Sequence, residues 1–191
     1  MEADWEIQLG GGAPIIEANG PGFIDLRPHP ERAALLPEAV AFPTLAEALF
    51  VLNAGTSPVW TSKCDVWPVL NVSDLDVDEL NAPPESVVHA LACYIDLLPQ
   101  VSYHWTTHID VAEYCKRACR HLRAVPLACC RADFVIRHAV VSDQSHSLTP
   151  MDRGITAYIT ACGASEDEAN STLQAALLVF ARVLSSQSTL E

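Results

Sequence analysis

The stretch from Arg131 to Leu184 constrains the fold most, because it shows a strand, a loop, a second strand, a tight turn and a long helix in succession. The two predicted strands, 132–141 and 155–161, alternate with the two-residue period of β-structure. Their apolar faces comprise Phe134, Ile136 and Val140 in the first strand and Ile155, Ala157, Ile159 and Ala161 in the second. Since the alanines leave space above the sheet, we expect a helix to pack there.

The predicted helix begins with a clear capping signal. Gly163 allows a sharp turn, Ser165 is a favourable N-cap, and Glu168 stands at the capping-box spacing from it. Apolar residues then recur at helical spacing, namely Ala169, Leu173, Ala176, Leu177, Phe180, Val183 and Leu184. Because the apolar surface is wider than one sheet face needs, we expect a deeply packed helix or a homo-oligomer that forms through residues 166–184.

The rest of the chain indicates one α+β domain over residues 1–191. Residues 1–56 predict a three-stranded β-meander followed by a helix, and residues 57–191 predict the main sheet and its helices. Within the latter, the segment 57–70 reads as an edge strand, because prolines interrupt it, and the apolar run 85–98 reads as a buried central helix. We expect a mixed, mostly antiparallel sheet with helices on one face, and a ferredoxin-like arrangement in the C-terminal two thirds.

The net charge indicates the class of partner, and the cysteine content indicates the cellular compartment. The net charge of −13 disfavours nucleic acid and anionic membrane surfaces as partners and favours a basic protein. Seven cysteines with no secretory signal at Met1 predict reduced thiols in the cytoplasm. No stretch approaches the length of a membrane span.

The acidic segment between residues 74 and 79 is the predicted partner-binding site. Its carboxylates are Asp74, Asp76, Asp78 and Glu79, and no Lys or Arg occurs from Asp65 to Asp96. An immunity protein or inhibitor that masks a basic nuclease carries charge of this kind, an analogy that rests on charge alone.

The candidates for catalysis are Cys64, His138 and His146. Lys63 would lower the pKa of the Cys64 thiol, and Asp65 would orient a histidine that comes from elsewhere, such as His138. His146 lies in the polar loop 142–153, and a loop of this length between paired strands is either functional or mobile.

His104 and His108 are the candidates for metal ligation, because two histidines at this spacing share a metal when the segment is helical. The capping signal at Asp110 instead places both before a helix, and no HExxH pattern accompanies them. We therefore expect no metal and no cofactor.

Three functions remain open. The leading hypothesis is a non-catalytic binding or regulatory protein that recognises a basic protein partner through its acidic surface. The second is a small cytosolic enzyme with a Cys/His thiol or acid–base site. The third is a homodimeric structural subunit.

Overall fold

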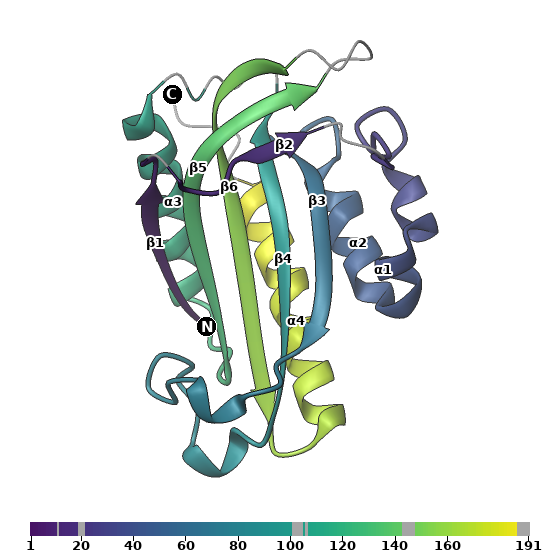
Figure 1. Ribbon diagram of the computed structural model, residues 1–191. Helices are drawn as coiled ribbons and strands as arrows, with labels where there is room; N and C mark the ends of the chain where they lie inside the picture. Colours follow the sequence, from purple (N-terminus) through teal and green to yellow (C-terminus); the bar gives the residue numbers. More distant parts are fainter. Residues whose placement is uncertain (11, 19–21, 101–104, 106, 143–147, 187–191) are drawn as a thin grey trace.

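A single mixed β-sheet organises the chain in the computed structural model, which describes residues 1–10, 12–18, 22–100, 105, 107–142 and 148–186 (Figure 1). Its six strands are β1 (Glu2–Gln8), β2 (Ile16–Ala18), β3 (Val59–Pro68), β4 (His89–Pro99), β5 (Cys130–Ser142) and β6 (Leu148–Gly163). The helices of the described part are α1 (Pro37–Ala41), α2 (Pro43–Leu52), α3 (His108–Arg123) and α4 (Glu166–Ser185), with short 3₁₀ turns at Pro30–Leu35, Val72–Asp74 and Pro84–Ser86.

The strands follow the order β1-β5-β6-β4-β3, and β2 also pairs with β5. The β5–β6, β6–β4 and β4–β3 pairs are antiparallel, whereas β1 and β2 run parallel to β5. This confirms the predicted α+β class and the mostly antiparallel sheet, with β3 at the edge. The ferredoxin-like arrangement is not confirmed.

The core lies between one face of this sheet and the helices α2, α3 and α4, whereas the opposite face carries no helix in the described part (Figure 1). Alternate side chains of the strands point into the core, among them Ile95, Phe134 and Ile159, each fully buried. Phe134 stacks on Phe180 of α4 with ring centroids 5.7 Å apart. The expected helix packing over the small alanines of β6 is therefore confirmed.

Helix α4 begins where its capping residues predict. The Ser165 side chain accepts a hydrogen bond from the Glu168 backbone N–H, and the Glu168 carboxylate accepts one from the backbone N–H of Ala164. The helix lies between α2 and α3 as well as against the sheet, so neighbours within the chain account for its wide apolar surface. The homo-oligomer through residues 166–184 stays a prediction.

Two predicted elements are wrong. The run 85–98 is mostly β4, because a strand buried on both faces shows the same continuous apolar composition as a buried helix. The N-terminal meander is absent from the described residues, because β1 and β2 pair with β5 and not with each other. A local turn does not specify parallel pairing between strands that lie far apart in the chain, so the sequence pattern could not predict this pairing.

None of the helices in the described part combines the length and the apolar character that crossing a membrane requires.

Candidate functional site

A row of polar side chains crosses the helix-free sheet face. The strand register aligns Asp65 of β3, Tyr94 of β4, Tyr158 of β6, Asp133 of β5 and Asp4 of β1. In each strand the row residue alternates with residues that pack into the core, which places the row on the opposite face. Two tyrosines therefore lie at the centre of the face, with carboxylates on both sides.

The tyrosines belong to a half-exposed aromatic strip on the same face. Trp67 and Tyr94 have ring centroids 6.1 Å apart, and Tyr94 and Tyr158 have centroids 6.4 Å apart. Burial, followed by the negative charges of Asp96 and other groups, raises the pKa of Tyr94 to about 12. The strip thus lies in a negative field, which favours cations over its ring faces.

A hydrogen-bonded network fixes the centre of the face. Thr156 donates to Asp96 over 2.7 Å, and Arg137 donates to the hydroxyls of Thr156 and Tyr158 over 3.0 and 3.2 Å. The second amino group of Arg137 reaches Gln8 over 3.2 Å. Because burial raises the pKa of Asp96 more than its partners lower it, this carboxyl holds its proton more tightly than a free one.

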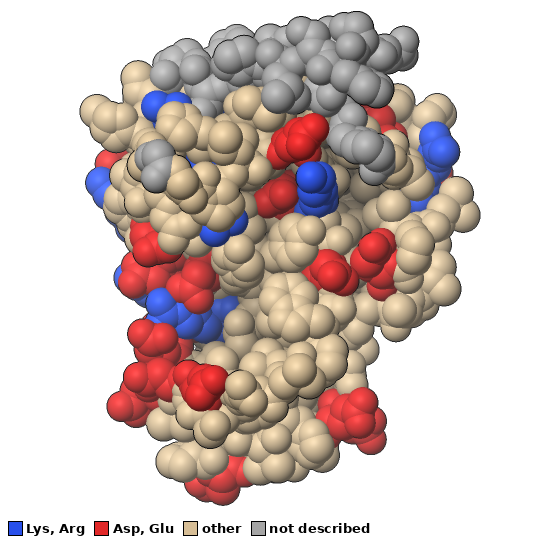
Figure 2. Space-filling model, viewed as in Figure 1, with Lys and Arg blue, Asp and Glu red and all other residues tan. Residues whose placement is uncertain are grey.

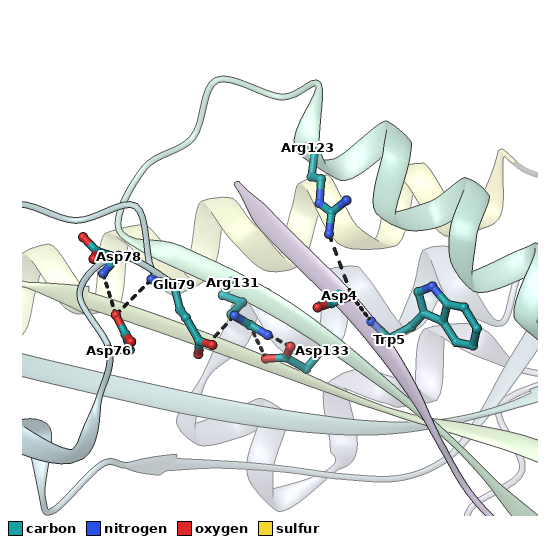
Figure 3. Close-up of polar contacts among 8 residues, drawn as sticks. All are labelled: Asp4, Trp5, Asp76, Asp78, Glu79, Arg123, Arg131 and Asp133. Atoms are coloured by element: carbon teal, nitrogen blue, oxygen red, sulfur yellow. Dashed lines mark hydrogen bonds and ion pairs between the residues drawn. The ribbon is translucent and has the colours of Figure 1, made fainter.

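The predicted acidic segment adjoins this face beside β5 (Figure 3). Asp76 accepts hydrogen bonds from the backbone N–H groups of Asp78 and Glu79 over 2.9 and 3.3 Å, which shapes the turn. Glu79 pairs with Arg131 over 3.1 Å, and Arg131 also binds Asp133 over 2.7 Å. The acidic segment is thus linked through Arg131 to the carboxylates of the row.

Carboxylates gather along the edge of the face that includes β1, with basic side chains between them (Figure 2). Burial, Glu79 and Asp4 raise the pKa of Asp133, and burial is the largest of these causes. Asp4 itself contacts Arg123 of α3 at 3.8 Å in an exposed pair. Together with Asp74 and Asp78, which form no side-chain pair in the described part, these groups make the acidic edge.

The structure does not bring Cys64 and His138 together. Three strand spacings of about 4.8 Å separate β3 from β5, and the Cys64 side chain packs against the core. Burial, with Glu38 as the next cause, raises the pKa of the Cys64 thiol to about 12, which opposes thiolate formation. His138 instead contacts the Leu9 carbonyl and the Arg153 guanidinium, each over 3.1 Å. His146 lies outside the described residues.

The metal candidates form no site that the structure describes. His108 is the first residue of α3, where it is exposed, and His104 lies outside the described residues. Thr107, and not Asp110, is the N-cap of α3, while Asp110 completes its capping box. Within the described ranges no cluster of three His, Cys, Asp or Glu side chains is placed to hold a metal ion.

Sequence reasoning missed the centre of this face. Tyr94 and Asp96 lie within the segment that the sequence predicts as a helix, and Arg137, Thr156 and Tyr158 lie on the strand faces opposite the predicted apolar ones. One signal of a strand with a polar face was present in β4, because Tyr94 and Asp96 alternate with Cys93, Ile95 and Leu97 at the two-residue period.

Comparison with known proteins adds no assignment: no protein family model matches the chain, and searches of curated proteins and of solved structures found no significant match.

Proposed function

We propose that this protein is a non-catalytic binding protein that recognises a basic protein partner through the helix-free face of its sheet. The observation that carries the proposal is the row in which Tyr94 and Tyr158 lie between the carboxylates of Asp65 on one side and Asp133 and Asp4 on the other. Aromatic residues at the centre of a surface with charged residues at its rim are typical of protein interfaces.

The charges define the kind of partner. The acidic segment and the carboxylates of β1 and β5 meet at one edge, and only Arg123 and Arg131 pair with them in the described part. Lysine and arginine side chains of a partner would gain from this negative edge during encounter and from the aromatic strip after docking. Long-range attraction of this kind weakens as salt increases.

The face also suits binding better than chemistry. The carboxyl of Asp96 is engaged by Thr156, and Arg137 is engaged by Thr156, Tyr158 and Gln8, so these groups hold one another in a fixed arrangement. A surface that is ordered before binding loses less entropy when the partner docks. The described residues give no comparable support to the enzyme hypothesis, since Cys64 and His138 lie apart.

Affinity capture with charge-matched variants tests the proposal. Asp74→Asn/Asp78→Asn removes two unpaired carboxylates from the acidic edge, and Glu47→Lys on α2 changes the net charge by the same amount on the helical side. We expect the wild type and Glu47→Lys to retain the same basic protein from a lysate of the native cell at low salt, and the double variant to lose most of it.

The captured protein is then purified and titrated against the three proteins over a series of salt concentrations. The proposal predicts an affinity that falls as salt increases and a smaller salt dependence for the double variant. Equal affinity of the double variant and the wild type, or a partner without a basic surface, would refute it.

A further inference from the structure

A cavity of about 240 Å³ opens between β3 and the segment 22–38. Apolar side chains, among them Phe23, Leu26 and Leu36, form part of its wall. Glu38 of α1 and Ser62 and Cys64 of β3 supply polar groups. Because its volume lies below the roughly 300 Å³ at which pockets for drug-sized molecules begin, the cavity suits a small ligand.

A β-bulge shapes the polar side of this cavity. Thr61 pairs with Leu97 and Cys64 pairs with Ile95, so β3 contains one residue more than β4 across this step. Bulges of this kind redirect side chains and are common at sheet edges and beside functional sites. Here the bulge interrupts the alternation of β3 at Ser62 and Lys63, which both line the cavity.

Two polar groups of the cavity have no partner in the described part of the chain. The hydroxyl of Ser62, a residue that lines the cavity, is buried without a hydrogen bond, and the Glu38 carboxylate forms neither an ion pair nor a side-chain hydrogen bond. A buried hydroxyl without a partner is unfavourable, which points to a ligand that satisfies it.

The lining of the cavity contains one carboxylate, Glu38, and one ammonium group, Lys63, whose side chain is exposed. After burial, the charge of Glu38 is the next cause that raises the pKa of the Cys64 thiol, and Glu38 also contributes to the raised pKa of Tyr94. The positive charge of Lys63 acts on Asp96, whose carboxyl belongs to the helix-free face. Inside the cavity, therefore, the field of Glu38 favours a cation.

We propose that this cavity binds a small primary alkylammonium ligand. The ammonium group donates hydrogen bonds to the Glu38 carboxylate and the Ser62 hydroxyl, and the alkyl chain packs against Phe23, Leu26 and Leu36. The cavity shares Tyr94 with the helix-free face, but neither its apolar wall nor Glu38 belongs to the acidic edge, so the two proposals can fail separately.

The test compares three probes of equal chain length, n-hexylammonium, n-hexanol and hexanoate, by isothermal titration calorimetry at pH 7.5. A primary amine with the ordinary pKa of about 10.4 is fully charged at this pH. We expect n-hexylammonium to bind at least ten times more tightly than either other probe. Equal affinity for the amine and the alcohol, or no binding of the amine, would overturn the proposal.

Cys64 reports whether the ligand occupies this cavity. Alkylation by iodoacetamide at pH 8.5, followed by peptide mass spectrometry, should slow at Cys64 when n-hexylammonium is present, and labelling of Cys129, which lies elsewhere, should not change. Binding without protection of Cys64 would place the amine at another site and would refute the proposal.

Variants separate the two polar contacts. Glu38→Gln should weaken n-hexylammonium binding at least tenfold and Ser62→Ala about threefold, while Glu47→Gln on the exposed side of α2 should leave it unchanged. Circular dichroism checks that each variant is folded, and Ser62→Ala keeps the proposal testable if Glu38→Gln does not fold. Wild-type affinity in a folded Glu38→Gln variant would refute the proposal.

Discussion

Thr156 donates a hydrogen bond from Oγ1 to Oδ1 of Asp96 over 2.7 Å, and this contact anchors the carboxyl group of a residue that is only 7% exposed. The two residues are register partners on β6 and β4, so the sheet itself sets their separation. Arg137 approaches the same hydroxyl from β5. One threonine thus connects a buried acid to a half-buried base.

The first prediction concerns the pH dependence of stability. Burial raises the pKa of Asp96 in the folded protein above its ordinary value of 3.8, so the folded state binds this proton more tightly than the unfolded chain. The contribution of Asp96 to the stability of the folded protein is therefore fully present below pH 3.8 and is lost as pH rises through the folded-state pKa.

Asp96→Asn removes this titration and retains an oxygen that accepts from Thr156. Urea unfolding between pH 4 and pH 8 should show that the variant gains stability relative to the wild type as pH rises. Asp78→Asn, an exposed carboxylate without a side-chain partner, is the matched control. Parallel profiles of the wild type and Asp96→Asn would contradict the prediction.

The second prediction concerns the turn before α4. A Cβ atom added at Gly163 would lie 2.5 Å from the backbone nitrogen of Ala169 and 2.6 Å from the Cβ of Glu168. Since backbone atoms cannot move aside cheaply, Gly163→Ala should lower the free energy of unfolding by about 3 kcal/mol. Chemical denaturation measures this change.

Gly55→Ala is the control, because its added Cβ meets no atom within 4 Å. We expect that substitution to change the free energy of unfolding by less than about 0.5 kcal/mol. Equal changes in the free energy of unfolding at the two glycines would contradict the prediction, because they would show that the turn before α4 relaxes to accommodate the added Cβ.

The third prediction concerns the aromatic strip and rests on the proposed function. Trp67→Ala should weaken binding of the basic partner by about 2 kcal/mol, roughly thirtyfold, because a tryptophan beside Tyr94 has the character of an interface hot spot. Phe50→Ala removes a 48% exposed ring from α2 on the other side of the sheet and should have no effect. Calorimetry with the captured partner distinguishes these outcomes.

The fourth prediction concerns the Cys64 thiol. With a pKa of about 12, its thiolate fraction at pH 7 lies about 3,000-fold below that of a free cysteine of pKa about 8.5. Its alkylation rate should therefore keep increasing well above pH 9, and Glu38→Gln should accelerate it by removing a negative charge. A rate at pH 7 that equals the rate of a model thiol would restore the enzyme hypothesis.

The sequence predicted best where local signals decide the structure. Ser165 and Glu168 placed the start of α4, because a cap depends on residues within one helical turn. Ile155, Ala157 and Ile159 placed the core face of β6, since a strand covered by helices on one side alternates strictly. Both predictions are confirmed.

Prediction failed where residues from distant parts of the chain determine the structure. The stretch from Leu91 to Leu98 is largely buried on both faces of β4, because Ala92 and Leu98 are buried outside the main core, and a buried helix has a similar composition. The acidic segment was visible as a charge run, but its link to Asp133 depends on Arg131, which lies 52 positions after Glu79 in the chain. Tyr94 and Tyr158 meet only through the strand register, which no local pattern encodes.

The strand order also determines when the sheet can form during synthesis of the chain. The innermost strand, β6, is the last to be synthesised, and β1 must wait for β5, about 130 residues later, before it finds its partner. Before β5 is synthesised only β3 and β4 can pair, and the two halves of the sheet cannot join until β6 has emerged, so the nascent chain exposes an incomplete sheet until almost the whole polypeptide has been made. A ribosome stalled before residue 130 should therefore hold a chain that chaperones recognise, whereas release after α4 should allow folding in a single cooperative event.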